Sequence, residues 1–257
     1  MIDFNLHTHT KRCHHAIGED EEYVKTAIKA GIKTLGFSDH APYLFPSGKQ
    51  QAHCIEVEQG EEYINSIKTL KRKYADKIEL HVGFEMEYYP SYFDGMVSYA
   101  KALGAEYLIL GQHAIYDGKL ATHKRKGTRE DFAEFVNCTV NAMKSGVFTY
   151  VAHPDIMQFD EDDKLYLSEM ERIAKTSAEL NIPLEINLLG IRRGRCYPSE
   201  NFFRIAGKIG SPITLGIDAH SPEEILEKNA IAVAKNLIKR YNLNYIGLPK
   251  INYLTNF

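Results

Sequence analysis

Seven short apolar segments, each typical of a buried β-strand, alternate along the chain with segments that have the 3.6-residue period of an amphipathic helix. The expected strands cover 2–6, 33–38, 78–84, 106–111, 148–152, 183–187 and 212–217. The expected helices cover 20–30, 56–75, 91–103, 129–145, 163–180, 199–208 and 222–239. A strand followed by a helix, repeated in this way, predicts a parallel sheet with right-handed crossover connections.

Such a sheet either closes into a barrel or stays open as a doubly wound sheet. Closure leaves no exposed edge strand, whereas an open sheet gathers its functional residues at the point where the strand order reverses. Nearly every expected strand here is followed by a histidine or a carboxylate, which favours a ring of strands. With 257 residues, 44% of them hydrophobic, the chain is expected to form one α/β barrel domain over residues 1–257.

Histidines and acidic residues lie at or just after the ends of the apolar segments. They are His7, His9, His15, His40, Glu85, His113, His153, Asp218 and His220. In a parallel barrel the carboxyl ends of all strands meet at one rim, where barrel enzymes have their active sites. A hydrogen-bonded core histidine is the competing interpretation for any one of them. The same placement at six strand ends favours a centre with several metal ions, because imidazole and carboxylate bind zinc, iron and manganese.

Charge and composition restrict the partners. A net charge of −3 gives no overall attraction to nucleic acid or to an anionic membrane, so a small soluble substrate is expected. The opening MIDFNLHTHT lacks the features of a secretory signal, and no apolar run has the length of a membrane span. The four cysteines are scattered without a CxxC pair, which favours reduced thiols. A cytoplasmic protein with no membrane or nucleic-acid partner is therefore expected.

The motifs at the strand ends resemble those of the PHP family, the polymerase and histidinol phosphatase domains. The matching segments are HTHTKRCHH, SDHAP, GFEMEYYP, the histidine of GQH, AHPD, EINLLGIRRG followed by YPS, and GIDAH. The arginine-bearing EINLLGIRRG segment resembles the monofunctional histidinol-phosphate phosphatases within that family. The resemblance implies a distorted (β/α)7 TIM-like barrel that hydrolyses L-histidinol phosphate to L-histidinol and inorganic phosphate in histidine biosynthesis.

The same resemblance implies three divalent metal ions, with Zn, Fe and Mn as the candidates. The first would be held by His7, His9, Glu85 and Asp218, the second by Glu85, His113 and His153, and the third by His15, His40 and His220. Glu85 would bridge the first two ions, and these would share a hydroxide that serves as the nucleophile. Nine ligands are too many for one zinc ion and suit three ions with open positions.

Cleavage of a phosphate monoester also needs cationic contacts. Arg192, Arg193 and Arg195 follow the sixth expected strand, and the planar guanidinium suits phosphate oxygens. Arg192 matches the glycine-x-arginine position of the resembling family and is expected to act in catalysis with Glu85 and Asp218. For at least one of the three arginines, a solvated surface cation is the competing interpretation.

Further side chains are candidates for supporting roles. His53 and His123 lie in two long connections, 41–55 and 113–128, that are expected to cover the site, and each is either a substrate contact or a surface histidine. Asp39 is expected to orient a ligand imidazole. The candidates for protonating the leaving group are Asp155 and Asp160, and those for binding the amine of the substrate are Glu87, Asp94 and Glu185.

Three other functions compete with this one. A different PHP-type phosphoesterase, such as a nucleotide phosphatase or an exonuclease, would favour a long basic groove, which the charge balance does not indicate. Zinc amidohydrolases begin with the same HxH pair but commonly have a carboxylated lysine at the fourth strand end, where this chain has His113. A non-catalytic metal-binding module would be expected to have lost ligands, and none is missing here.

Overall fold

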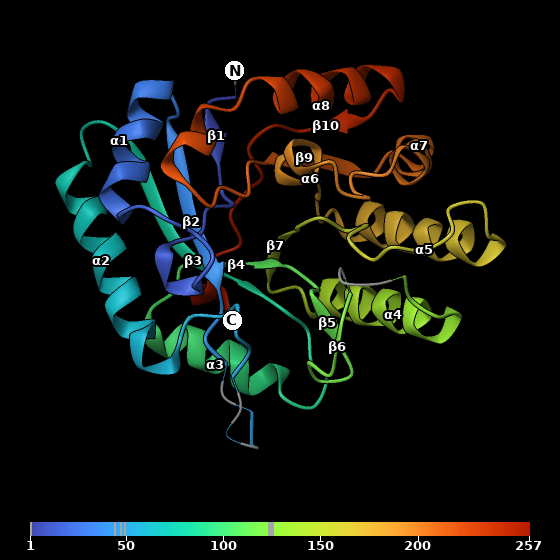
Figure 1. Ribbon diagram of the computed structural model, residues 1–257, viewed down its shortest axis with the longest axis horizontal. Coiled ribbons are helices and arrows are strands. Elements are labelled where there is room, and N and C mark those ends of the chain that lie inside the picture. Colours follow the sequence, from blue (N-terminus) through green and yellow to red (C-terminus); the bar gives the residue numbers. More distant parts are fainter. Residues whose placement is uncertain (1, 44, 47, 49, 123–125) are drawn as a thin grey trace.

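A curved sheet of eight parallel strands forms the centre of the molecule, and the helices cover its outer face (Figure 1). The computed structural model describes residues 2–43, 45–46, 48, 50–122 and 126–257. The strands of the sheet are β1 Phe4–Asn5, β2 Thr34–His40, β3 Glu79–Met86, β4 Tyr107–Leu110, β7 Phe148–Val151, β8 Leu184–Asn187, β9 Pro212–Gly216 and β10 Asn244–Tyr245. They are hydrogen-bonded in this order, and each neighbouring pair is parallel.

Helices connect the successive strands. They are α1 Asp20–Ala30, α2 Gly60–Lys73, α3 Phe93–Leu103, α4 Arg129–Ser145, α5 Lys164–Leu180, α6 Leu188–Arg193, α7 Glu200–Ile209 and α8 Asn229–Arg240. Short 3-10 turns are η1 Lys11–Cys13, η2 Val57–Gln59, η3 Pro222–Leu226 and η4 Leu254–Asn256. Capping boxes begin α1 and α4, and a glycine with positive φ follows each of these helices. Within the described ranges, no helix is long and apolar enough to cross a membrane.

Each expected strand and helix has a counterpart in the structure, and the prediction of a TIM-like α/β fold is confirmed. The predicted helix 222–239 is interrupted, because η3 ends at Leu226 and α8 begins at Asn229. The elements outside the prediction are α6, β10, the 3-10 turns η1 and η4, and a hairpin of β5 Ala114–Ile115 and β6 Leu120–Ala121. These elements are too short to show a sequence period, and both residues of β10 are exposed.

The segment that follows β1 and the segment that follows β9 meet at one rim of the curved sheet. Thr8 and Ala219 form a parallel bridge there, with His9 N donating to the Ala219 carbonyl at 2.9 Å. Next to the bridge, a side chain replaces a backbone hydrogen bond between the two segments: Asn5 Oδ1 accepts a hydrogen bond from Ile217 N at 2.8 Å. The barrel is therefore closed at the rim and only partly closed along this seam. The closure brings the end of β1 next to the end of β9.

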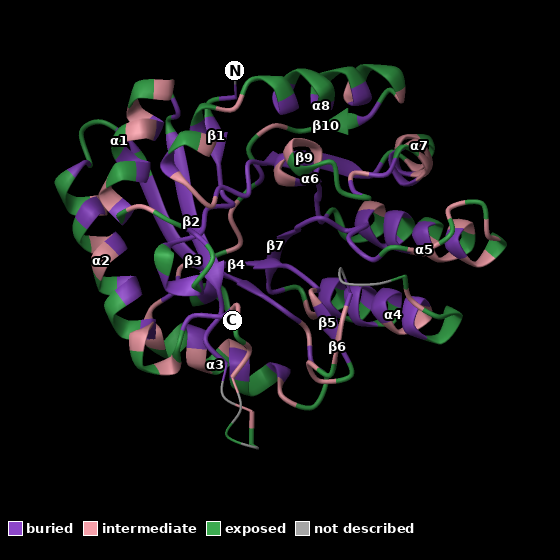
Figure 2. Ribbon diagram, viewed as in Figure 1, coloured by how far each residue is buried: buried purple, intermediate pink, exposed green. Residues whose placement is uncertain are grey.

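Two buried layers support the rim. The larger lies between the sheet and the helices, and Figure 2 shows buried residues along the strands and exposed ones on the outer faces of the helices. A smaller cluster fills the barrel interior and consists of Leu6, Tyr107, Ile109, Tyr150 and Ala152. Tyr107 donates to the Leu6 carbonyl at 2.8 Å, although β4 and β1 are not neighbours in the sheet. This packed interior lies beneath the candidate functional residues and supports them.

Candidate metal centre

The predicted ligands come together at the carboxyl ends of the strands. His40 and Glu85 lie at the ends of β2 and β3, and the others follow their strands. Most of them surround a cavity of about 440 Å³. Those that line it are His9, His15, His40, Glu85, His113, His153, Asp218 and His220. His7 is fully buried beside this group.

The deepest group consists of His7, His9, Glu85 and Asp218. His7 Nε2 lies 3.4 Å from Glu85 Oε2 and 3.6 Å from Asp218 Oδ1. The corresponding distances from His9 Nε2 are 3.5 and 3.2 Å. These four atoms are buried without a hydrogen-bond partner among the described residues, although buried polar atoms normally have one. Two atoms bound to one ion at about 2.1 Å lie about 3.0–3.4 Å apart, so the group fits a divalent cation.

The other carboxylate oxygen of Glu85 faces a second pair of imidazoles. Its Oε1 lies 2.8 Å from His153 Nε2 and 3.5 Å from His113 Nε2. Gly111 makes room for this carboxylate, because a Cβ atom there would overlap Glu85 Oε1. Glu85 thus presents one oxygen to each of two ligand groups, which is the arrangement of a carboxylate that bridges two ions.

A third group lies beside the first and contains His15, His40 and His220, whose ligand atoms are within 4.8 Å of one another. The ring centroid of His15 is 4.7 Å from that of His220 and 5.3 Å from that of His40. His40 Nδ1 also lies 3.2 Å from Glu85 Oε2, which joins this group to the first. His15 is exposed, whereas the other eight predicted ligands are buried or partly buried.

Acceptors behind the imidazoles fix the direction in which the rings point. His7 Nδ1 lies 2.9 Å from Glu185 Oε1, and His9 Nδ1 lies 3.2 Å from Asp39 Oδ1. His15 Nδ1 lies 2.6 Å from the Cys13 carbonyl. An acceptor at Nδ1 holds the proton there and leaves the Nε2 lone pair for a metal ion. The orienting role predicted for Asp39 agrees with this contact.

Burial and neighbouring charges shift the pKa values within the cluster. Burial opposes protonation of His7, but three nearby carboxylates raise the pKa of His7 well above its ordinary value. Burial would raise the pKa of Glu85, but the surrounding imidazoles, His113 foremost, hold that pKa well below its usual range. Burial lowers the pKa of His40 well below its ordinary value. An ionised Glu85 and a neutral His40 are the forms that bind cations.

The backbone at two of the predicted ligands has an unusual conformation. His153 and Asp218 have φ angles of 29° and 52°, in the left-handed region that non-glycine residues rarely adopt. Such strain persists only where the surrounding structure holds it, and it is concentrated at functional sites. The Asp218 side chain is held by Asn187 Nδ2, which donates to Asp218 Oδ2 at 3.0 Å. The strain is therefore consistent with a side chain held in one required direction.

The three predicted arginines have different positions. Arg195 lines the cavity, its side chain is exposed, and no ion pair is formed by it within the described part of the chain. Arg193 is exposed and pairs with Glu224 at 3.2 Å. Arg192 does not line the cavity, because its guanidinium binds the backbone behind the site. The substrate contact predicted for Arg192 stays a prediction, and the geometry favours Arg195.

The guanidinium of Arg192 holds the segment that carries Asp218 and His220. It donates to the carbonyls of Ile217 and Asp218 at 2.9 and 3.1 Å and pairs with Glu224 at 3.1 Å. We therefore expect Arg192→Ala to weaken metal binding at Asp218 and His220 and to lower kcat about 10–100-fold, as for other residues that support metal ligands. Metal content after dialysis and steady-state kinetics measure this. A raised KM at full metal content would instead support the direct substrate contact.

The other candidates for substrate contacts differ in their position relative to the cavity. His53 lines the cavity, with Nε2 3.3 Å from Glu87 Oε1, and its ligand atom lies within 4.8 Å of those of His40 and His113. His123 lies outside the described residues. Among the acids expected to bind an amine, Glu87 adjoins the cavity residue His53, and Asp94 lines a separate pocket.

Glu185 has a role that the sequence pattern did not indicate. It is fully buried, and Oε2 accepts hydrogen bonds from His153 N at 3.0 Å and from Asn187 Nδ2 at 2.8 Å. Glu185 also contacts His7 Nδ1 at 2.9 Å, so that this carboxylate orients the imidazole of a predicted ligand. Its position two residues before the helix cap Asn187, on a strand facing the ligands, is the signal that sequence reasoning did not use.

The remaining candidate acids, Asp155 and Asp160, differ in burial. Burial raises the pKa of Asp155 to about 7, the direction that a proton donor needs. Its Oδ2, however, accepts a hydrogen bond from Ser199 N, and Asp155 is not among the residues that line the cavity. Asp160 is exposed, and it pairs with Lys126 at 3.9 Å. Donation of a proton to the leaving group by either acid stays a prediction.

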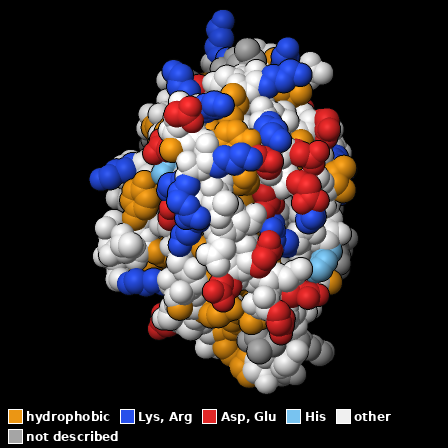
Figure 3. All heavy atoms as spheres, turned by 90° about the vertical axis from the view of Figure 1, so that its left-hand side faces the viewer, with side chains coloured by type: hydrophobic (Ala, Val, Ile, Leu, Met, Phe, Trp, Pro, Cys, Tyr) orange, Lys and Arg blue, Asp and Glu red, His pale blue; other side chains and the backbone are white. Residues whose placement is uncertain are grey.

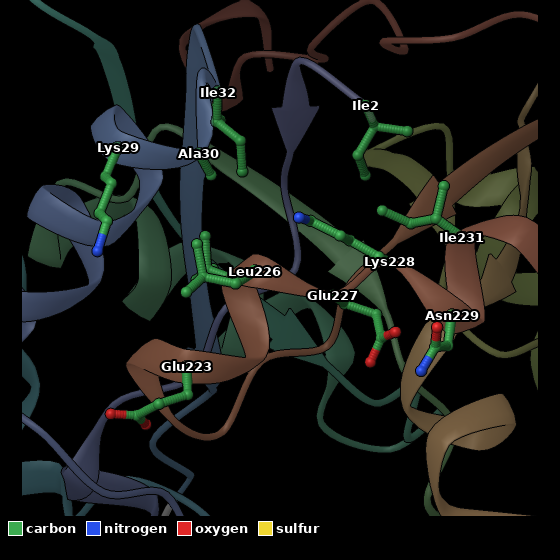
Figure 4. Close-up of a pocket in the computed structure, with 11 residues that line it drawn as sticks. Ile2, Lys29, Ala30, Ile32, Glu223, Leu226, Glu227, Lys228, Asn229 and Ile231 are labelled. Atoms are coloured by element: carbon green, nitrogen blue, oxygen red, sulfur yellow. The ribbon is translucent and has the colours of Figure 1, made fainter.

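A larger cavity lies elsewhere on the molecule and lacks this chemistry. It has a volume of about 680 Å³ and is lined by residues near the start of β1 and β2 together with the segment 223–231 (Figure 4). Figure 4 shows the apolar side chains of Ile2, Ile32, Leu226 and Ile231 with Lys29, Lys228, Glu223 and Glu227 among them. None of the histidines and cysteines that the structure describes lines it. The smaller cavity with the imidazoles is therefore the candidate active site.

Comparison with known proteins agrees with the geometry. A probable histidinol-phosphatase of Deinococcus radiodurans is 26% identical over 239 residues, which cover 88% of this chain and 90% of the relative. A probable histidinol-phosphatase of Schizosaccharomyces pombe is 22% identical, with 87% and 82% covered. The crystal structure of a histidinol phosphate phosphatase from Lactococcus lactis, complexed with zinc, L-histidinol and phosphate, has a TM-score of 0.71, 19% identity, and 95% coverage of both chains.

The family model of the PHP domain matches residues 5–188. The matched range contains the predicted ligands from His7 to His153, while Asp218 and His220 follow it, after β9, and line the same cavity. The match covers more than half of the chain, and so the chain belongs to the PHP domain family.

Proposed function

We propose that the protein is a metal-dependent phosphomonoesterase that hydrolyses L-histidinol phosphate to L-histidinol and inorganic phosphate. The observation that carries this proposal is the position of Glu85, whose two carboxylate oxygens face two separate groups of imidazoles at 2.8–3.5 Å. Clustered cations suit a phosphate monoester, which is a dianion that hydrolyses extremely slowly without catalysis. Membership of the PHP family supports the same reaction class.

We further propose that the nine predicted ligands hold three divalent ions, with Zn, Fe and Mn as the candidates. Such ions would neutralise the phosphate and lower the pKa of bound water towards about 7, which supplies a nucleophile near neutral pH. Glu185 and Asp39 fix the imidazoles of His7 and His9, so that their Nε2 atoms point at the shared site before substrate binds. Arg195 lines the cavity, and its guanidinium would bind phosphate oxygens there.

Histidinol phosphate as the substrate is supported by similarity. The two curated relatives described above are probable histidinol-phosphatases, and the Lactococcus lactis protein was solved with L-histidinol and phosphate. Zinc in that structure also supports zinc as one candidate ion for this chain. Residues 1–257 are proposed to form a single domain, because one buried layer includes residues from Ile2 to Leu254.

A substrate panel tests the proposal. Purified protein with quantified metal is assayed for phosphate release from histidinol phosphate, nucleoside monophosphates and short oligonucleotides. We expect kcat/KM for histidinol phosphate to exceed the others by at least tenfold. The face over α1 and α2 in Figure 3 has basic and acidic side chains interspersed, and both Lys25 and Lys73 there pair with Glu21, so this face offers no basic groove for a nucleic acid. Preferred cleavage of oligonucleotides would contradict the proposed substrate.

Arg195→Ala is expected to raise KM for the phosphate ester about tenfold or more, because it removes a charged contact to the substrate, while the metal content stays unchanged. The matched control is Arg193→Ala, which removes the same charge from an exposed side chain that pairs with Glu224. Steady-state kinetics and elemental analysis of both variants measure the difference. Equal KM values for the two variants would exclude Arg195 as the phosphate contact.

A further inference from the structure

A buried arginine, Arg12, lies in the turn η1, next to Cys13 at the wall of the candidate active-site cavity. The Arg12 side chain is 7% exposed, although an arginine cannot lose its charge in a protein. Its Nη1 and Nη2 bind Asp20 Oδ1 and Oδ2 at 2.9 Å each, and its Nε and Nη2 bind Glu62 at 2.6 and 3.0 Å. The guanidinium also lies 5.7 Å from the centre of the Tyr63 ring. This planar fork joins η1 to both α1 and α2.

The turn that Arg12 anchors carries one of the predicted metal ligands. η1 follows His9 and is followed at once by the loop with His15. His14 ends the turn with a φ of 67°, and the His15 ring is held by its Nδ1 contact to the Cys13 carbonyl at 2.6 Å. Among the described residues, the His15 ring contacts other elements through the rings of His9, His40 and His220. The direction of His15 therefore depends on the backbone of η1.

The geometry points to Arg12 as a positioning residue: we propose that its ion pairs with Asp20 and Glu62 hold η1 so that His15 completes the third metal site with His40 and His220. This inference rests on the three-ion centre of the proposed function. His15 is the exposed member of the ligand set, so its site depends most on the anchoring of its loop. The ligands of the first two sites are buried, apart from His113, which is partly buried, and they do not need this anchor.

The expected result is a selective loss of one ion. Protein loaded with Mn²⁺ or Zn²⁺ is dialysed, and the metal per chain and the dissociation constant of the weakest ion are measured. Arg12→Lys keeps the charge but loses the two-pronged contact to Asp20, so we expect it to retain two ions and to bind the third at least tenfold more weakly. His15→Ala, which removes the ligand itself, should also retain two ions.

Addition of excess metal distinguishes the positioning role of Arg12 from the role of His15 as a ligand. It should restore the third ion and kcat in Arg12→Lys, because the ligand is still present, and should fail to do so in His15→Ala. Lys11→Gln is the matched control: it removes a positive charge from the same turn, where Lys11 is exposed and pairs with Glu19, and it should keep three ions. The Glu62 side chain is 64% exposed, so Glu62→Gln removes one charged partner of Arg12 without disturbing the core. It should weaken binding of the third ion to a smaller extent than Arg12→Lys does.

Three outcomes overturn the inference. The first is wild-type metal affinity in Arg12→Lys and Glu62→Gln. The second is parallel loss of all ions with a lowered melting temperature, which would indicate only general destabilisation. The third is a wild-type protein that holds fewer than three ions, which would remove the premise as well. A wild-type protein with three ions that does not cleave histidinol phosphate would contradict the proposed substrate alone, since the metal measurements do not use a substrate.

Discussion

Replacement of Glu85 by glutamine is expected to lower phosphate release by about three orders of magnitude or more and to reduce the metal content by as many as two ions per chain. Glu85 is 2% exposed, and its two oxygens face different imidazoles: Oε2 faces His7, His9 and His40, and Oε1 faces His113 and His153. A glutamine has one neutral acceptor and an NH₂ group that cations repel, so it cannot neutralise two ions at once. Loss of a shared ligand removes the charge that stabilises both the ions and the transition state.

The measurement combines kcat with elemental analysis. A matched control on the same strand distinguishes loss of a metal ligand from a general effect of a glutamate-to-glutamine change on β3. Glu79 lies at the other end of β3, and its side chain is 61% exposed. Glu79→Gln makes the same chemical change on the same strand and should keep full activity and metal. The circular dichroism spectrum of Glu85→Gln should match that of the wild type. Near-normal turnover of Glu85→Gln would mean that this carboxylate is not a bridging ligand.

Removal of the metal is expected to abolish turnover and to lower the melting temperature by about 10 °C. A ligand present at about 1,000 times its dissociation constant stabilises the folded state by about 4 kcal/mol, and 1 kcal/mol corresponds to about 2–4 °C in a chain of this size. Without ions, the buried Nε2 atoms and carboxylate oxygens of the deepest group have no partners among the described residues. Chelation, scanning calorimetry and re-addition of metal measure the effect, and activity that survives full chelation would contradict the metal-dependent mechanism.

The gain in melting temperature on metal loading is expected to increase with pH. Burial opposes protonation of His7 and His9, but nearby carboxylates raise the pKa of both well above the ordinary value of about 6.5. A raised folded-state pKa stabilises the metal-free protein below about pH 6.5, and this contribution is lost as the pH rises through the raised value. Metal binding must displace the same protons. The stabilisation by metal should therefore be larger at about pH 8 than at about pH 6, and a gain independent of pH would argue against imidazole ligands.

The alternation of strands and helices could be predicted from the sequence, because the spacing of the apolar residues indicates which face of each element is buried. The expected strand at 148–152 corresponds to β7 Phe148–Val151, and the expected helix 129–145 has the bounds of α4. The predicted ligands that line the cavity followed from the same pattern, since every parallel strand ends at the same rim. The elements outside this prediction, such as β10, are short or exposed and so carry no period.

The identity of the side chains that support the site depended on contacts between residues far apart in the chain. Glu185 and His7 are 178 positions apart and lie 2.9 Å from each other only after the sheet closes. His53 in a long connection could be read as a surface histidine or a substrate contact, and the fold places it at the cavity. Arg12 has no sequence signal of its own, because its two partners belong to α1 and α2.

The sequence by itself determined the parallel α/β barrel and the set of residues that reach its rim, because strand and helix periods are local properties of the chain. Only the tertiary structure decided which of those residues face the cavity. Arg192 and Arg195 are three positions apart, but α6 ends at Arg193 and is followed by Gly194 with a φ of 57°. This reversal leaves Arg192 bound to the backbone carbonyl of Asp218 and brings Arg195 to the wall of the cavity. The direction of a side chain after a short helix depends on packing against distant segments, and a local pattern does not contain that information.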